Sequence, residues 1–93
     1  MKTPGLSLYK IIYENTVVKK DIPDLPHSIR PLIKEAIEYR LMTGPVAFGK
    51  PLRFSLKGLR RIRISDYRVI YDIDVEGHSV RIIAIKHRKA VYE

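Results

Sequence analysis

Cysteine is absent from this chain of 93 residues. Its absence excludes disulfide bonds, thiol nucleophiles and cysteine-ligated metal sites, and it is typical of proteins of the reducing cytoplasm. No apolar run approaches the roughly 20 residues of a membrane-spanning helix, and no apolar region of a signal peptide follows Met1. The sequence therefore predicts a cytoplasmic protein without a membrane-spanning segment.

Patterns that bind nucleotides or metals are also missing. Gly44, Gly49 and Gly58 fit neither of the glycine-rich phosphate-binding fingerprints. Asp72 and Asp74 are expected on one face of a strand, but no clustered histidine or further acid completes a metal site. We therefore expect no cofactor and no metal.

Acidic residues are few, with 10 Asp and Glu against 18 Lys and Arg, and the formal net charge is +8. Residues 1–49 hold 7 basic and 5 acidic residues, a net charge of +2, whereas residues 50–93 hold 11 and 5, a net charge of +6. Such a concentrated basic surface favours a polyanionic partner, nucleic acid first. The alternative is a basic protein whose Lys and Arg side chains are simply solvated.

The length predicts a single domain over residues 1–93. A β-branched and aromatic run indicates a strand over residues 6–13, and a short helix interrupted by prolines follows. The clearest element is a helix over residues 28–41, where apolar residues recur on one face. Ser28 is expected to cap this helix, and Pro31 to lie in its first turn.

The second half of the sequence predicts a series of strands. Residues 43–51 are expected to form a loop, and the strands that follow are expected over residues 52–56, 60–65, 67–75 and 80–87. The last of these is rich in β-branched residues and is expected inside the sheet. The fold class is therefore α+β, with an N-terminal strand, a helical hairpin and then a four-stranded antiparallel sheet segment.

Side chains alternate between the two faces of a strand. Arg61 and Arg63 therefore share a face, and Arg68 faces the same way from the neighbouring strand. The opposite face, expected against the helices, carries Ile62, Ile64, Val69, Tyr71 and Ile73. Three guanidinium groups that converge predict an anion site, because their planar forks suit phosphate. Solvated arginines on an exposed sheet face are the alternative.

A basic tail, Lys86-His87-Arg88-Lys89, follows the last strand and precedes Tyr92. His87 is the side chain best suited to accept a proton near neutral pH, and its cationic neighbours favour a neutral imidazole that can act as a base. Tyr92 can stack on a base or donate a proton. The alternatives are a structural hydrogen bond for His87 and a place at the edge of the core for Tyr92.

Four blocks of the sequence resemble a known family. They are Gly49-Lys50-Pro51-Leu52, Arg61-Ile62-Arg63-Ile64, the DYRVIYDI block that begins at Asp66, and the HRK block followed by Val91-Tyr92. Together they resemble the RelE/ParE superfamily of type II toxins, within it the RelE-like branch. The resemblance implies a small α+β fold and a ribosome-dependent, metal-independent endoribonuclease that cuts mRNA in the ribosomal A site. In that reaction the ribose 2′-OH attacks the adjacent phosphorus.

The resemblance also implies roles for individual residues. Arg68 matches the arginine that stabilises the transition state, and Arg88 matches one that supports the phosphate and leaving group. His87 is the expected base, and Tyr92 matches the aromatic residue that orients the substrate. The residues expected to bind RNA are Arg61, Arg63, Lys50, Arg53, Lys57, Lys86 and Lys89. Arg61 and Arg63 stand where the best-known members carry lysines.

The family further implies a cognate antitoxin bound in a toxin–antitoxin hetero-oligomer. Two other functions stay open at this point. One is a ParE-like toxin that inhibits DNA gyrase and has no nuclease activity. The other is a catalytically weak module that mainly binds its antitoxin.

Overall fold

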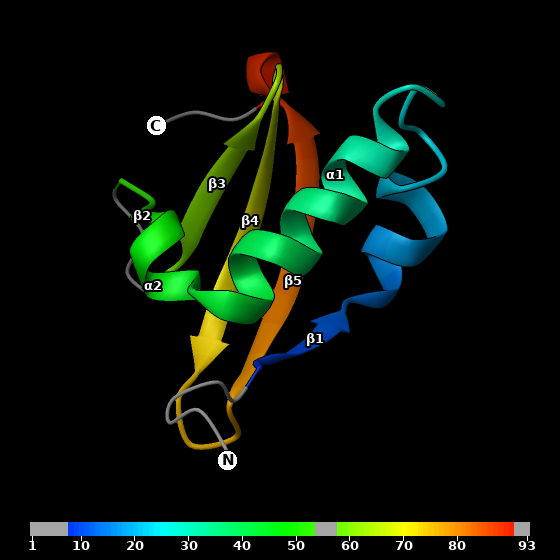
Figure 1. The fold of residues 1–93 in the computed structure, drawn as a ribbon. Helices are drawn as coiled ribbons and strands as arrows, with labels where there is room; N and C mark the ends of the chain where they lie inside the picture. The colour runs from blue at the N-terminus through cyan, green and yellow to red at the C-terminus, as the bar shows by residue number, and fades with distance from the viewer. Residues whose placement is uncertain (1–7, 54–57, 91–93) are drawn as a thin grey trace.

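The computed structural model describes residues 8–53 and 58–90, whose five strands form one sheet in the order β1-β5-β4-β3-β2 (Figure 1). Strands β2 to β5 pair antiparallel with their neighbours, and β1 runs parallel to β5. The strands are β1 (Lys10–Tyr13), β2 (Lys50–Pro51), β3 (Arg60–Ile64), β4 (Tyr67–Asp74) and β5 (Ser79–His87). The predicted α+β class and the four-stranded antiparallel segment are confirmed, and β5 lies inside the sheet as expected.

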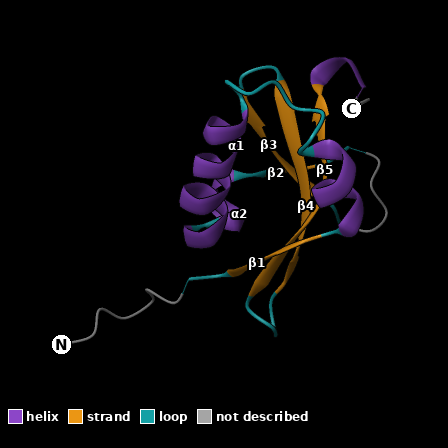
Figure 2. Cartoon of the chain, turned by 90° about the vertical axis from the view of Figure 1, so that its right-hand side faces the viewer, coloured by secondary structure: helices purple, strands orange, loops and turns teal. Residues whose placement is uncertain are grey.

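The helical segments are η1 (Val17–Asp21), α1 (Arg30–Ala36), η2 (Ile37–Leu41), α2 (Pro45–Phe48) and η3 (Arg88–Ala90). Segments α1 and η2 follow one another without a break and correspond to the helix predicted over residues 28–41. Figure 2 shows α1 and α2 along one side of the sheet. Pro31 lies in the first turn as predicted, but the predicted cap is wrong, because Ile29 occupies the N-cap position and Ser28 lies in the preceding turn.

The core lies between this helical layer and one face of the sheet. Tyr71 of β4 and Ile82 of β5 are fully buried, together with Ile37 and Leu41 of η2. The residues predicted for this face are buried in the core or packed against it: Ile62, Ile64, Val69, Tyr71 and Ile73. Removing one such side chain from water contributes about 1.5–3 kcal/mol. The predicted core face of β3 and β4 is therefore confirmed, although Ile70 on the opposite face of β4 is also buried.

The segment between residues 43 and 51 was expected to be a loop, but it contains α2 and β2. The buried Tyr71 hydroxyl donates a hydrogen bond to the carbonyl of Pro45, at 2.6 Å. The Arg60 guanidinium donates to the carbonyls of Val46 and Gly49, at 2.9 and 2.8 Å. These long-range bonds hold the helical turn against the sheet, which local sequence patterns do not reveal.

Gly49 has a packing reason to lack a side chain. A Cβ atom built there would lie 1.7 Å from the Tyr71 hydroxyl oxygen and 3.1 Å from the carbonyl oxygen of Arg61. The glycine therefore lets β2 begin directly beside Tyr71, with Lys50 opposite Arg61. The strand predicted over residues 52–56 is wrong in its described part, because pairing with β3 involves residues 50 and 51 instead.

On each side of the sheet, a side chain bonds to one backbone group beyond the end of the short edge strand. Strand β1 pairs with β5 only as far as Ile82, and beyond this point the Asp21 carboxylate accepts a hydrogen bond from the backbone N–H of Ile85, at 2.9 Å. At the other edge, beyond the residues paired with β2, the Arg40 guanidinium donates to the carbonyl of Arg63, at 3.1 Å. Each side chain satisfies one backbone group that has no strand neighbour there.

Candidate nucleic-acid interface

The sheet register gathers cations on the face opposite the core. Arg63 lies opposite Arg68, and Arg68 lies opposite Lys86. Directly paired residues share a face, so these three side chains form a row across β3, β4 and β5. Lys50 lies opposite Arg61 in the same way. The predicted shared face of the three arginines is confirmed, and the register adds two lysines to it.

A cleft of about 190 Å³ lies at the end of this row. We call it the arginine cleft, and it is lined by Arg63, Ser65, Asp66, Tyr67, Arg68 and Arg88. It therefore brings together three of the arginines that were predicted to act on the substrate. Ser65, with a backbone φ of 56°, and Asp66 form the turn between β3 and β4.

Arg88 is fixed to this turn. Its backbone N–H donates to the carbonyl of Asp66 at 2.7 Å, and its guanidinium Nε lies 3.7 Å from the Asp66 carboxylate. Arg68 Nη1 lies 3.4 Å from the carbonyl of Arg88. Both Arg88 and Asp66 remain exposed, so their ion pair is weak and leaves the cleft open to an anion.

A second cleft, of about 280 Å³, adjoins the first along the free edge of β3. We call it the edge cleft, and it is lined by Arg40, Phe48, Lys50, Arg61, Ile62 and Arg63. Four of these six residues are cations and none is acidic. Arg63 lines both clefts. Sequence reasoning missed Arg40 and Phe48, because only the fold places them beside β3.

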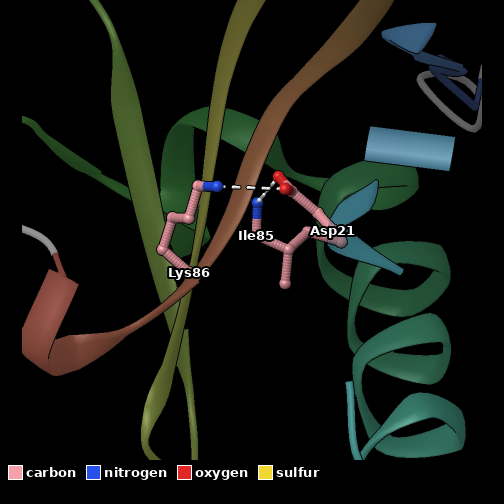
Figure 3. Close-up of polar contacts among 3 residues, drawn as sticks. All are labelled: Asp21, Ile85 and Lys86. Atoms are coloured by element: carbon pink, nitrogen blue, oxygen red, sulfur yellow. Dashed lines mark hydrogen bonds and ion pairs between the residues drawn. The ribbon is translucent and has the colours of Figure 1, made fainter. Parts of the chain in front are cut away.

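Lys86 makes a weaker contribution to the basic face than its charge suggests. Its Nζ lies 3.0 Å from the carboxylate of Asp21, whose other oxygen accepts from Ile85 N–H (Figure 3). The Lys86 side chain is 42 % exposed, whereas that of Asp21 is 5 % exposed. The ion pair neutralises part of the charge that was predicted to meet RNA.

His87 lies on the other face of the sheet from the arginines. It pairs with Tyr67, and the two rings meet edge to face with centroids 5.2 Å apart. Its Nδ1 accepts a hydrogen bond from the backbone N–H of Lys89, at 3.2 Å. His87 does not line the arginine cleft, although its neighbour Tyr67 does. The structure therefore does not bring the predicted base into line with the predicted cations.

A bulge in β5 explains this orientation. Ile70 lies opposite Ala84, but Tyr71 lies opposite Ile82, so Ile83 has no partner of its own on β4. One extra residue reverses the alternation of every side chain that follows it. The bulge therefore directs Lys86 to the basic face and His87 to the core face.

The remaining predicted residues lie elsewhere. Arg53 is exposed in the turn after β2, and Lys89 is exposed in η3. Neither lines the two clefts. Lys57 and the predicted catalytic Tyr92 lie outside the described residues.

Within residues 8–53 and 58–90, no group of three or more His, Asp or Glu side chains is arranged to hold a metal ion. No helix in that part of the chain has the length and apolar character needed to cross a bilayer.

The structure defines a class of small α+β proteins that carry two adjoining basic clefts beside β3. The model of one family matches residues 10–92, and it describes the ParE toxin of the type II toxin–antitoxin system parDE. The chain therefore belongs to the RelE/ParE superfamily of type II toxins, as its sequence blocks predicted.

Relatives from Mycobacterium tuberculosis (strain ATCC 25618 / H37Rv) support the RelE side of this superfamily. The chain is 42 % identical to Toxin RelE over 73 residues, which is 78 % of this chain and 75 % of the relative. It is 35 % identical to Toxin RelG over 77 residues, which is 83 % of this chain and 88 % of the relative.

Solved structures have the same fold. The chain is similar to one in the crystal structure of the toxin–antitoxin complex RelBE2 from M. tuberculosis, with a TM-score of 0.78 and 33 % identity over 87 % of this chain and 92 % of that one. It is also similar to a chain of the archaeal RelE–RelB complex from Pyrococcus horikoshii OT3, with a TM-score of 0.65 and 25 % identity over 90 % and 99 %.

Proposed function

We propose that this type II toxin is a ribosome-dependent, metal-independent endoribonuclease that cleaves mRNA in the ribosomal A site. The observation that carries the proposal is the arginine cleft, in which Arg63, Arg68 and Arg88 line one small cavity. A gyrase-binding surface has no need for three guanidinium groups around a space of this size. The RelE and RelG relatives support the same branch.

In the proposed reaction, the ribose 2′-oxygen bonds to the adjacent phosphorus while the bond from phosphorus to the 5′-oxygen breaks. One proton leaves the 2′-OH and one reaches the 5′-oxygen, which gives a 2′,3′-cyclic phosphate and a free 5′-hydroxyl end. The phosphorus is pentavalent in the transition state and carries additional negative charge. Arg68 and Arg88 stabilise this charge more than they stabilise the starting phosphate, which is the condition for catalysis.

Proton transfer is assigned to His87, with Tyr92 or Arg88 assisting the leaving group. For His87 to act as the base, its imidazole must approach the substrate past Tyr67, the ring that it contacts. Asp66 is held beside Arg88, so we assign it the role of orienting that guanidinium. A toxin with so few acid–base groups depends on the ribosome to place the 2′-OH in line with the phosphate.

The partner that we propose is an antitoxin of the RelB type, bound in a hetero-oligomer. The RelBE2 structure from M. tuberculosis and the RelE–RelB structure from P. horikoshii are both toxin–antitoxin complexes. The net charge of +8 suits an acidic antitoxin segment as well as it suits RNA. Because the proposed target is the translating ribosome, we place the active toxin in the cytoplasm.

Inhibition of DNA gyrase is the second candidate function, and the ParE description of the matching family model favours it. One experiment separates the two. The toxin is induced in bacteria, mRNA 5′ ends on translating ribosomes are mapped, and covalent gyrase–DNA complexes are assayed in the same cells. Cuts within codons support the nuclease, whereas trapped gyrase with intact mRNA refutes it.

Single substitutions test the roles of the residues in the same cells. Arg68→Ala is expected to lower the cleavage rate by about 100- to 1000-fold, the usual loss for one transition-state donor. Lys19→Ala is the matched control, because Lys19 is an exposed cation on η1 that lines neither cleft. His87→Gln tests the base, and full activity of that variant would reassign the proton transfer to another group.

A further inference from the structure

Two exposed aromatic rings lie beside the edge cleft. Tyr39 of η2 is 65 % exposed and Phe48 of α2 is 47 % exposed, and their ring centroids are 5.9 Å apart at an interplanar angle of 53°. Phe48 itself lines the edge cleft. Single exposed apolar side chains are ordinary. Two neighbouring aromatic rings on a basic surface, in contrast, suit a ligand that has both flat rings and anionic groups.

Cations surround these rings on the side of β3. Arg40 follows Tyr39 in the chain and lines the edge cleft with Phe48 and Lys50. Arg40 and Tyr39 also line an adjoining hollow of about 270 Å³ that reaches Ser65 at the turn after β3 and whose other lining residues are Leu32, Glu35, Ala36 and Ile64. The rings and the cations therefore belong to one continuous surface.

Local contacts order the backbone that carries the two rings. The Thr43 hydroxyl donates to the carbonyl of Tyr39. A Cβ atom at Gly44 would lie 3.2 Å from the Phe48 ring, so the ring covers that glycine closely. Arg40 is fixed by its bond to the carbonyl of Arg63. These contacts place the backbone of both aromatic residues and one neighbouring cation before a ligand binds.

The surface leads directly to the arginine cleft. Arg63 lines both clefts, and β2 covers β3 only at Arg60 and Arg61. A single strand that follows this edge meets the aromatic rings and the edge-cleft cations first, and Arg68 after them.

We propose that Phe48 and Tyr39 form a nucleobase-stacking platform for single-stranded RNA, with phosphates of the same strand on the cations of the edge cleft. The inference rests on the proposed function only in taking RNA as the substrate. Bases and phosphates alternate along a single strand, and rings and cations lie side by side here in the same way. Stacking on an aromatic side chain is tolerant of sequence, because every base has a flat face. The platform therefore holds the strand beside the scissile phosphate without reading its sequence.

A short RNA and its abasic counterpart test the platform directly. Binding of the purified toxin to a fluorescent eight-nucleotide oligouridylate is compared with binding to an abasic oligonucleotide with the same number of phosphates. Wild type is expected to prefer the RNA, and Phe48→Leu is expected to weaken RNA binding by about 5- to 150-fold, the usual loss for one stacked base. Affinity for the abasic strand should not change. Phe48→Trp should restore binding, since it restores an aromatic face.

Salt dependence separates stacking from phosphate binding. Lys50→Ala should make the slope of log K against log salt shallower by about 0.7, the value for one phosphate contact of a single strand, whereas Phe48→Leu should leave it unchanged. Val75→Ala is the matched control, because Val75 is 75 % exposed and apolar but lies in the turn between β4 and β5. Unchanged thermal unfolding of each variant shows that the fold is intact.

The contrary outcomes are distinct. Equal affinity of wild type for the two oligonucleotides, or no binding of either, overturns the platform. So does a Phe48→Leu variant that keeps its RNA affinity but loses its antitoxin, which would make this surface a protein-binding site. Stacking-dependent RNA binding without mRNA cleavage on ribosomes would refute the proposed function and leave the platform intact.

Discussion

Replacing Asp21 by alanine removes a carboxylate that joins η1 to the sheet. The residue is 6 % exposed, and its two oxygens accept hydrogen bonds from the backbone N–H of Ile85 and the ammonium of Lys86, at 2.9 and 3.0 Å. Strand β1 ends before it reaches Ile85. The substitution therefore leaves a buried backbone donor without its acceptor as well as a cation without its counter-ion.

The two bonds are expected to differ in strength. A hydrogen bond to a charged acceptor contributes about 1.5–3 kcal/mol, and an orphaned buried donor costs a similar amount. The ion pair with Lys86 is worth only about 0.2–1 kcal/mol, because that side chain is 42 % exposed and solvent screens it. Asp21→Ala should therefore lower the free energy of unfolding by about 2–4 kcal/mol, and Lys86→Met by about 1 kcal/mol or less.

Urea unfolding followed by circular dichroism measures these differences. Asp21→Asn keeps an oxygen for the Ile85 N–H and loses the charge, so its cost should lie between those of the other two variants. Asp21→Ala should retain most of its cost in the Lys86→Met background. The reasoning fails if Lys86→Met alone destabilises the protein as much as Asp21→Ala does, since the ion pair would then carry the stability.

Three further predictions concern packing, pH and an exposed ion pair. Gly49→Ala should destabilise the fold by about 1–3 kcal/mol through overpacking. Tyr71→Phe should relieve part of this cost, because the Cβ contact at 1.7 Å is with the Tyr71 hydroxyl. Chemical denaturation of both single variants and of the double variant measures the coupling between the two positions. Burial raises the pKa of Tyr71, and also of Tyr13, in the folded protein. The contribution of these two phenols to the free energy of unfolding is therefore fully present below the unfolded pKa of about 10 and is lost as pH rises through the folded pKa values. The urea midpoint of the protein should fall above pH 10, and it should fall less steeply for Tyr71→Phe. Arg81 forms a solvent-exposed ion pair with Asp72 at 2.9 Å, so Arg81→Ala should leave the thermal unfolding temperature and the proposed mRNA cleavage almost unchanged.

Local patterns predicted the parts of the fold that depend on local geometry. Alternation along β3 and β4 has a period of two, so the core residues and the arginine face followed directly from the order of residues. The helix over α1 and η2 was found in the same way, from its apolar face. Its start was placed wrongly, since nothing in the spacing distinguishes a capping Ser28 from one in the preceding turn.

The parts that could not be predicted depend on distant residues. The α2 turn rests on hydrogen bonds from Tyr71 and Arg60, and Asp21 meets a strand 64 residues further along the chain. The orientation of His87 depends on the bulge at Ile83. No glycine or other turn residue in this part of the sequence predicts that bulge. Arg40 and Phe48, which only the fold places beside β3, were accordingly the residues that sequence reasoning missed.

We propose that the toxin cleaves mRNA on the ribosome at the arginine cleft. Purified ribosomes paused with a defined codon in the A site are mixed with excess toxin, and primer extension measures the single-turnover rate of cutting. We predict that wild type cuts within that codon and that Arg68→Ala cuts about 100- to 1000-fold more slowly. Intact mRNA with wild-type toxin, or an Arg68→Ala variant as fast as wild type, would contradict the claim.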